Sequence, residues 1–314
     1  FVMKKDEETG WNQRLFNQHS SAISCLDVHY GKNLLVTAEN NGPSSRVVIW
    51  DLLTFSVLST IPSRHGVKLI DVSENGTLLL VVSADLAATV TMYEISTGRV
   101  VFARPLLLGP RTVKDSITDV RFTGTAAMFA VSSVLQGVTF FVEEGGSFMG
   151  EDGLKLYEER SGLYQAIGRP AFGAAVTELC RFEGADELVA GTEKGQLLVW
   201  HGRTVAQLIE AHRTPVNALD FNKNTLTLIS GGGDGVINIY MLAAHSAPSP
   251  VKAKKTAHLV VPRMLELSAT FDILRHDLCS FSIRSLTLSA DSRRALLTTA
   301  ACEVLELALF ITPP

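Results

Sequence analysis

Short runs of alternating apolar and polar residues recur along the chain, and turns rich in glycine, asparagine or aspartate separate them. The clearest copy opens with Val216–Phe221, continues with Leu226–Ser230 and the turn Gly231–Gly235, and ends with Val236–Tyr240. Such alternation, with β-branched and aromatic enrichment, is typical of half-buried antiparallel strands. No segment of about 12 or more residues keeps a helical period. The pattern predicts an all-β fold.

The opening run of this unit occurs six times. The other five openings are Ile23–Val28, Val67–Val72, Ile117–Phe122, Val176–Phe182 and Ile283–Leu288. The shortest spacing between openings suits one four-stranded blade of ~40 residues. Longer spacings require insertions, which we expect at Asn40–Ser45, Glu143–Gly153 and Ala243–Ala257. The sequence predicts a β-propeller with six readable blades, or seven if an insertion hides a degenerate copy.

The two ends of the chain are predicted to share one blade. The last copy has room for three strands before Pro314, and Trp11–Gln18 reads as an isolated strand ahead of the first opening. Pairing between them would close the ring and remove exposed edges. We expect one propeller domain over 1–314, with the closing strand in 1–18 and the blades in 19–312. Because the first residue is Phe1 rather than Met, we expect a fragment of a longer protein.

Four residues of the fifth copy have the spacing of a structural hydrogen-bond relay. His212 precedes the first strand, Ser230 ends the second, Asp234 lies in the tight turn and Tyr240 ends the third. A buried, fully satisfied network of this kind fixes strand register. The first copy keeps part of the set, namely His19, Thr37, Trp50 and Asp51. The fourth copy has Trp200 but carries Lys194 where aspartate is expected, and the second and third have neither.

The same residue types invite a catalytic reading. Ser230, His212 and Asp234 match a nucleophilic triad, but no GxSxG elbow surrounds the serine, and a strand-end serine in a packed blade leaves no room for substrate. A propeller hydrolase would instead need carboxylates facing a central channel. The candidates are Asp27, Asp71, Asp119 and Asp220, which we interpret as caps of turns at strand ends. We therefore expect no enzyme activity and no catalytic residue.

Composition narrows the classes of function that remain. The net charge of −4 gives no sign of the basic surface that binds nucleic acid. The longest apolar runs have the length of a strand and are too short to span a membrane. Neither the eight histidines nor the acidic loop Glu143–Asp152 has metal-ligand spacing, so we expect no metal, cofactor or small-molecule substrate. The four cysteines lack CxxC spacing and read as free thiols in a reducing, cytoplasmic compartment: Cys25, Cys180, Cys279 and Cys302.

The motifs resemble those of the WD-repeat superfamily and, more narrowly, the first propeller of the echinoderm microtubule-associated-protein-like family. The similarity lies in Gly195–Gly202, Ala211-His212 and the triple-glycine turn Gly231–Gly235, and in the long turn Glu39–Arg46 before Val47–Asp51. The resemblance implies a cytoskeletal scaffold that binds tubulin or microtubules.

A short basic run is the candidate contact with the acidic surface of tubulin. It comprises Lys252, Lys254 and Lys255 and follows a Pro/Ser-rich segment; a solvated insertion is the alternative reading. Two other functions are left open: an adaptor in ciliary transport or ubiquitin ligation, and a propeller hydrolase.

Overall fold

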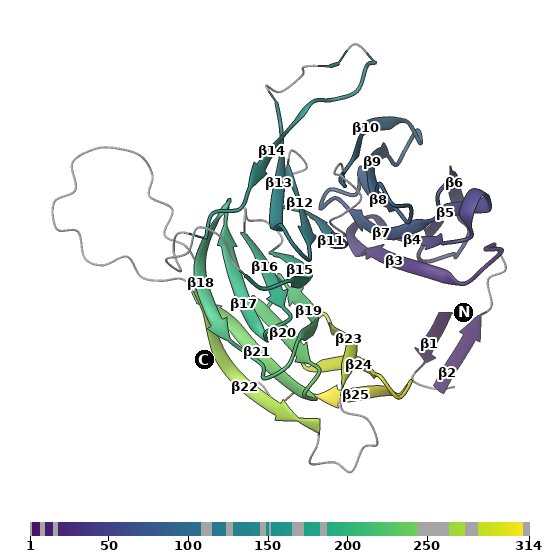
Figure 1. Ribbon diagram of the computed structural model, residues 1–314. Helices are drawn as coiled ribbons and strands as arrows, with labels where there is room; N and C mark the ends of the chain where they lie inside the picture. The colour runs from purple at the N-terminus through teal and green to yellow at the C-terminus, as the bar shows by residue number, and fades with distance from the viewer. Residues whose placement is uncertain are drawn as a thin grey trace. The chain divides into compact units, whose positions relative to one another are not determined.

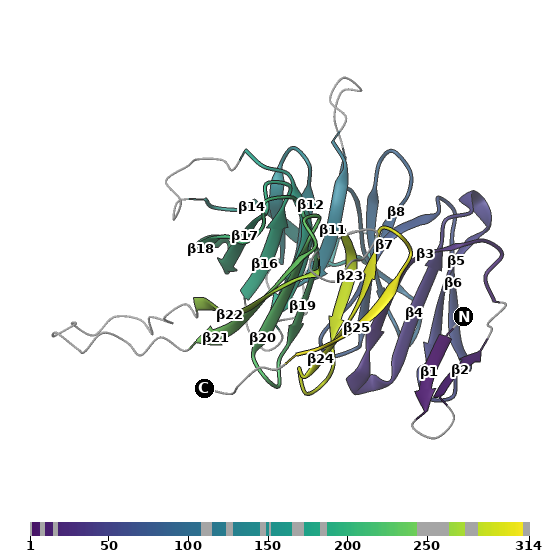
Figure 2. The same ribbon diagram turned by 90° about the horizontal axis from the view of Figure 1, so that it is seen from below.

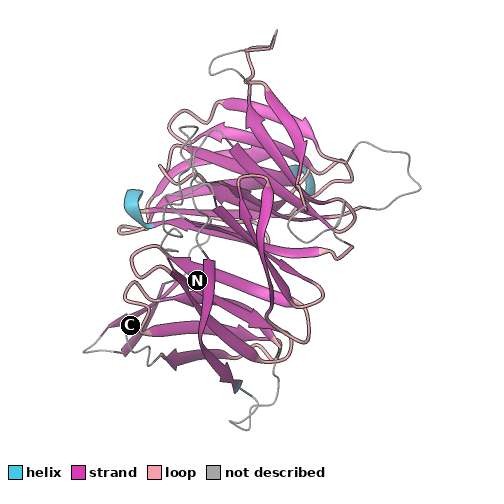
Figure 3. Ribbon diagram, turned by 90° about the vertical axis from the view of Figure 1, so that its left-hand side faces the viewer, coloured by secondary structure: helices cyan, strands magenta, loops and turns pink. Residues whose placement is uncertain are grey.

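Antiparallel strands make up almost all of the described chain (Figure 1). The computed structural model describes residues 2–6, 10–14, 18–107, 115–123, 128–144, 149–150, 152–164, 173–182, 187–243, 264–273 and 282–309. The helical elements of these ranges are two single turns, η1 (Tyr30–Lys32) and η2 (Gly42–Ser44) (Figure 3). The prediction of an all-β fold is confirmed.

The strands fall into two compact units. Unit 1 comprises 1–113 and 144–156, and unit 2 comprises 114–143 and 157–314. Unit 1 contains a hairpin and two four-stranded sheets: β1 (Val2–Asp6) with β2 (Gly10–Arg14); β3 (Ile23–His29), β4 (Leu34–Glu39), β5 (Ser45–Asp51) and β6 (Val57–Ser63); and β7 (Val67–Val72), β8 (Leu78–Ser83), β9 (Thr89–Glu94) and β10 (Val100–Pro105).

Unit 2 contains four further sheets. They are β11 (Ile117–Phe122), β12 (Met128–Ser133), β13 (Gly137–Glu143) and β14 (Tyr157–Ser161); β15 (Val176–Phe182), β16 (Glu187–Thr192), β17 (Gln196–His201) and β18 (Thr204–Glu210); β19 (Val216–Asn222), β20 (Thr227–Gly232), β21 (Val236–Ala243) and β22 (Met264–Asp272); and β23 (Ile283–Leu288), β24 (Arg294–Thr299) and β25 (Val304–Ala308). The first strands β15, β19 and β23 follow one another side by side (Figures 1 and 2).

Each of these six sheets is a meander in which every strand pairs with the next one along the chain. Their first strands, β3, β7, β11, β15, β19 and β23, begin at the six predicted openings. Of the expected insertions, the first holds η2 and the second joins β13 to β14, while 244–257 lies outside the described residues. The prediction of six blades is therefore confirmed.

The predicted pairing of the chain ends stays a prediction, because the N-terminal strands belong to unit 1 and the last sheet belongs to unit 2. β2, which overlaps the expected closing strand, pairs antiparallel with β1 from Asp6↔Gly10 to Val2↔Arg14. Within the described residues, the last sheet has three strands. The sequence reading missed β1 because Val2–Asp6 carries three charges in five residues and does not alternate.

A β-bulge at the start of every first strand sets the direction of its side chains. In β19 the register shifts between Val216 and Ala218, and the other five first strands shift at the same point. An unbulged strand alternates faces with a period of two, so its first and fourth side chains would point to opposite sides. With the bulge, Val216 and Leu219 are both buried, and Asn217 and Asp220 both reach the next sheet.

Glycine in the second strand allows consecutive sheets to approach closely. A β-carbon at Gly191 would lie 2.7 Å from the nearest side-chain atom of Val216, and one at Gly231 would lie 2.6 Å from Leu286 and 2.7 Å from Ile283. Fully buried aliphatic residues fill the rest of these interfaces, among them Ile229, Ile237 and Ile239. Apolar burial between sheets therefore holds the repeat together, as a propeller requires.

Candidate functional site

The structure brings the predicted relay residues of the fifth sheet into contact. His212 Nε2 lies 2.8 Å from Ser230 Oγ, and His212 Nδ1 lies 3.3 Å from Asp234 Oδ1. The Asp234 carboxylate also accepts hydrogen bonds from the backbone N–H groups of Arg213 (2.9 Å) and Val236 (3.2 Å). One aspartate thus joins the strand-connecting loop before β19 to the turn between β20 and β21.

Burial controls the protonation of this relay. The side chain of His212 is completely buried. Burial lowers the pKa of His212 and outweighs the carboxylate of Asp234, which raises it. The neutral imidazole then donates from Nδ1 to Asp234 and accepts from the Ser230 hydroxyl at Nε2.

Tyr240 takes part through its hydroxyl, which hydrogen-bonds with Ser230 and Asn238; burial nevertheless raises the pKa of Tyr240 to about 12. Asn238 in turn donates from Nδ2 to the carbonyl of Ala211 at 2.7 Å, directly before His212. The third strand is therefore tied to the same loop as the second.

Close backbone approach makes two glycines necessary here. A β-carbon at Gly232 would lie 2.3 Å from Asp234 Oδ1 and 2.6 Å from His212 Nδ1. Gly195, in the preceding sheet, has φ +80° and accepts at its carbonyl the backbone N–H of His212 at 2.8 Å. The loop that carries His212 is thus held by the turns of two successive sheets.

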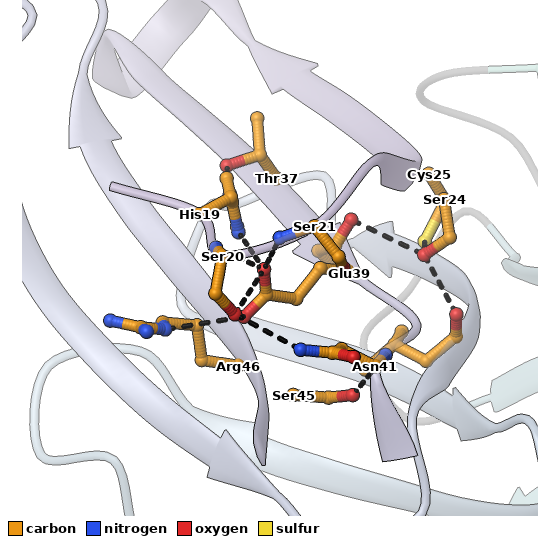
Figure 4. Close-up of polar contacts among 12 residues, drawn as sticks. His19, Ser20, Ser21, Ser24, Cys25, Thr37, Glu39, Asn41, Ser45 and Arg46 are labelled. Carbon is orange, nitrogen blue, oxygen red and sulfur yellow. Dashed lines mark hydrogen bonds and ion pairs between the residues drawn. The ribbon is translucent and has the colours of Figure 1, made fainter. Parts of the chain in front are cut away.

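A second relay occupies the first sheet (Figure 4). Thr37 Oγ1 lies 2.7 Å from His19 Nε2 and accepts the indole N–H of Trp50 at 2.7 Å. Because the threonine oxygen accepts from Trp50, its hydroxyl hydrogen is available for His19 Nε2, which leaves the His19 proton on Nδ1. His19 Nδ1 faces Glu39 Oε2 at 3.5 Å.

Glu39 is the member of this relay that the sequence reading missed. Its completely buried carboxylate accepts the backbone N–H groups of Ser20 (2.7 Å) and Ser21 (3.0 Å) and pairs with Arg46 Nε at 3.2 Å (Figure 4). Burial, the largest single influence, raises the pKa of Glu39, but the Ser21 and Ser20 amides, His19 and Arg46 together lower it below its usual value. Burial also lowers the pKa of His19 despite the facing carboxylate.

Glu39 performs the task that Asp234 performs in the fifth sheet, from a different place. It ends β4, opposite Ile23, whereas Asp234 lies in the turn after β20. The turn after β4 contains η2, and the carboxylate comes from the end of the strand instead of from the turn. An acidic residue two positions after Thr37 was the available signal.

Asp51 does not join the relay. Its Oδ1 accepts the backbone N–H groups of Leu53 (3.0 Å) and Thr54 (2.7 Å), so it caps the turn between β5 and β6. These hydrogen bonds, with Thr54 first, lower the pKa of Asp51.

The other sheets keep fragments of the relay. In the second sheet, Asp85 accepts from Ser83 Oγ at 2.5 Å and faces His65 Nδ1 at 3.8 Å, which corrects the expectation that this copy lacks the aspartate. In the fourth sheet, Lys194 Nζ donates to the carbonyl of Gly173 at 3.2 Å.

The fourth sheet also has an unsatisfied donor. Ala190 occupies the register position of Thr37 and Ser230. The buried indole N–H of Trp200 has no acceptor within the described residues. This sheet keeps the tryptophan of the relay without its hydrogen-bond partner.

Three of the four first-strand aspartates join consecutive sheets, and their interpretation as turn caps is wrong. Asp27 Oδ2 accepts the backbone N–H of Val72 at 2.7 Å, Asp119 Oδ2 that of Leu179 at 2.9 Å, and Asp220 Oδ2 that of Leu288 at 2.7 Å. The fourth aspartate, Asp71, is buried in β7. Their partners lie one repeat further along the chain, so no local pattern indicates them.

A second row of bonds runs parallel to the first. Ser24, Thr177 and Asn217 each follow the opening residue of a first strand and donate to the carbonyl of the next opening residue, at 2.7, 2.5 and 2.9 Å respectively. We name the two rows together the first-strand clips. They fix the register of one sheet against the next.

Glu178 adds a titratable group to these strands. It accepts the backbone N–H of Leu219, yet burial first, and then the charge of Asp119, raise the pKa of Glu178 to about 8. Arg121, which pairs with Asp119 at 3.5 Å, partly offsets that rise.

The remaining expectations concern ligands and membranes. Lys252, Lys254 and Lys255 lie outside the described residues. Within the described ranges, no group of three or more His, Cys, Asp or Glu side chains is placed to hold a metal ion. No helix there is long and apolar enough to cross a membrane.

Both relays have the atom order of a nucleophilic triad, a hydroxyl on Nε2 and a carboxylate on Nδ1. The same order occurs twice, and both hydroxyl residues are buried, with Thr37 5% and Ser230 0% exposed. Each hydroxyl also bonds to an aromatic residue of the third strand. The arrangement holds strands in register and presents no nucleophile to a substrate.

Comparisons with known proteins support the repeat and the fold. The family model "WD domain, G-beta repeat" matches residues 10–51 and 203–240. The chain is similar to the β-propeller domain of Cps50 (Swd1) from Myceliophteria thermophila, with a TM-score of 0.69 and 15% identity over 92% of this chain and 84% of that one. The chain therefore contains WD40 repeats and has the fold of a six-bladed β-propeller.

A curated relative gives a more specific likeness. The chain is 25% identical over 261 residues to "Cilia- and flagella-associated protein 251" of Chlamydomonas reinhardtii. The match covers 73% of this chain and 30% of that protein, so the chain spans less than a third of its relative.

Proposed function

We propose that the chain is a non-catalytic protein-interaction scaffold that binds tubulin or microtubules, in the setting of a cilium or flagellum. WD40 propellers serve typically as interaction scaffolds, and the name of the algal relative supports the ciliary setting. The resemblance to the echinoderm microtubule-associated-protein-like family favours a microtubule partner.

The first-strand clips are the observation that carries the scaffold proposal. Side chains such as Asp220 and Asn217 hold the backbone of the next sheet at 2.7 and 2.9 Å, and the relays hold the connecting loops. Loops on a rigid support present a fixed surface, so little ordering entropy is lost when a partner binds. The polar residues that resemble a catalytic set are engaged in these hydrogen bonds within the protein.

Co-sedimentation with stabilised microtubules tests the proposal, with an unrelated WD40 propeller as control. We expect saturable pelleting that weakens as salt rises from about 50 to about 300 mM, because exposed charge pairs are screened. A chain that stays in the supernatant at low salt contradicts microtubule binding and favours the adaptor alternative.

The basic run is tested within the same assay. Reversal of Lys252, Lys254 and Lys255 to Glu is expected to weaken pelleting at least tenfold. The matched control reverses three exposed cations elsewhere, Lys32, Arg64 and Arg284. Equal loss in both triple variants would assign the effect to net charge and remove the basic run from the proposal.

A further inference from the structure

Five sheets end in a fourth strand, and in the described part of the chain no further strand pairs with its outer edge. An unpaired edge can pair with another chain, and proteins prevent this with proline, charge, short length or a covering segment. β6 contains Pro62 and β10 ends with Pro105, while β14 has five residues of which three are charged. β18 is covered by its own chain, because Leu163 pairs with it in parallel.

Within the described residues, β22 lacks these protections. With nine residues it is the longest described strand, and its sequence, MLELSATFD, contains no proline and no basic residue. Leu267 on this strand is 59% exposed. A bulge at Ser268 interrupts β22, but β6 and β18 have bulges as well, so the bulge does not distinguish it. Because β22 and β18 both belong to unit 2, they can be compared directly.

The covered edge of β18 shows how an extended segment occupies such an edge. Val205 donates its backbone N–H to the carbonyl of Leu163 at 3.0 Å, and Leu163 donates its own N–H to the carbonyl of Arg203 at 2.7 Å. The side chain of Val205 is fully buried. Main-chain hydrogen bonds and the burial of one apolar side chain therefore hold this segment on the edge.

Leu267 is the counterpart of Val205 in the next sheet. Val205 lies opposite Trp200 and Leu267 lies opposite Tyr240, and a bulge follows both residues. Since the backbone N–H of Val205 points outward to its covering segment, the N–H of Leu267 is expected to point outward too. The same register position is thus covered in one sheet and exposed in the other.

Gln207 supports this orientation from the side of β18. Its side-chain amide accepts the backbone N–H of Leu265 at 2.9 Å and donates to the carbonyl of Leu265 at 3.0 Å. Both main-chain groups of Leu265 therefore point away from β21. Because the main-chain groups of every second residue in an antiparallel strand point to the same side, those of Leu267 are directed outward next to them.

We propose that the outer edge of β22, from Leu267 to Asp272, binds an extended segment of a partner protein by β-strand addition. Main-chain hydrogen bonds hold the segment, as they hold Leu163 on β18, and an apolar side chain of the segment covers Leu267. The strand carries Glu266 and Asp272 and no cation, so the segment is basic on either side of its apolar residue. A basic segment differs from the acidic surface of tubulin, and the proposal does not depend on the microtubule partner.

Fluorescence anisotropy with a labelled synthetic peptide tests the proposal on the whole chain. The probe is a heptapeptide of alternating Val and Thr with Lys at each end. One control peptide has Glu in place of Lys, and the other has all internal amides N-methylated. We expect the probe to bind and the Glu peptide to bind more weakly. N-methylation should weaken binding by about tenfold or more, because the main-chain donors are lost.

One protein variant places the probe on β22. Leu267→Lys is compared with Val57→Lys, because Val57 holds the same register position on β6, opposite Trp50, and is 40% exposed. Lysine on an edge strand opposes pairing, so Leu267→Lys should weaken probe binding by about tenfold and Val57→Lys should leave it unchanged. An unchanged far-UV spectrum shows that both variants fold.

Four results would overturn the proposal. They are no binding of the probe, equal binding of the N-methylated peptide, equal weakening by the two lysine variants, and a dimer that Leu267→Lys dissociates in analytical ultracentrifugation. The dimer would identify a second copy of the chain as the occupant of the edge. The peptide comparison uses the unaltered protein, so it gives a result even if a variant does not fold.

Discussion

The unsatisfied indole of the fourth sheet gives a direct test of the relay chemistry. Trp50 donates to Thr37 at 2.7 Å, whereas Trp200 is fully buried and Ala190 stands where its acceptor would be. The Ala190→Ser change places a hydroxyl at this position. A buried donor without a partner costs ~1–3 kcal/mol, and a hydrogen bond formed in its place contributes ~1 kcal/mol.

A double-mutant cycle isolates the new bond from its side effects. Burying the added hydroxyl has a desolvation cost of its own. Ala190→Ser has the same cost in a Trp200→Phe background, where no indole can form the bond, so this cost cancels in the cycle. We expect a coupling energy of about 1–2 kcal/mol between the two positions, measured as the free energy of unfolding in urea. Ala190→Val controls for volume and is expected to destabilise the sheet in both backgrounds.

The reasoning fails if the coupling energy lies within ~0.3 kcal/mol of zero, the usual scatter for independent sites. The register equivalence of Ala190 with Thr37 would then not extend to their side chains.

Three further predictions concern the buried groups. Gly232→Ala is expected to destabilise the chain to urea by at least ~2 kcal/mol, because its β-carbon would collide with Asp234 and His212, whereas Gly233→Ala meets its nearest atom at 3.2 Å and serves as control. Lowering the pH is expected to reduce stability, because burial lowers the pKa of His212. The contribution of the neutral His212 to the free energy of unfolding is complete above pH 6.5 and is lost as the pH falls through the pKa of the folded state. His212→Gln should therefore reduce the difference in unfolding free energy between pH 7 and pH 5. Glu178 has the opposite sign, because its pKa is raised to about 8 from 4.5 and its contribution is lost as pH rises; Glu178→Gln should therefore gain stability over the parent between pH 5 and pH 9, and an unchanged difference would contradict the shift.

The strands were predictable because their signals are local. Alternation and turn residues lie within about 40 residues of each other, and the opening at Val67 or Ile117 coincides with the strand that the structure contains. The relay of the fifth sheet has all its members between His212 and Tyr240, and their spacing was enough to predict that they interact.

The features that the sequence did not reveal depend on distant partners. Asp27 bonds to Val72 and Asp220 to Leu288, one repeat away, so nothing beside either aspartate marks its role. Glu39 escaped notice because it takes the role of Asp234 with a different residue type, and from the end of β4 instead of from the turn. The strand β1 escaped notice because Val2–Asp6 carries three charges in five residues and does not alternate.

The first-strand clips have a consequence for how such repeats diverge. The recipient of each clip is a main-chain amide or carbonyl, as in the bond from Asp27 to Val72 or from Ser24 to Val67. Every residue type except proline offers the amide, and all offer the carbonyl. Substitutions on the receiving strand therefore leave the clip intact, and neighbouring copies can drift apart in sequence while their alignment in space is retained.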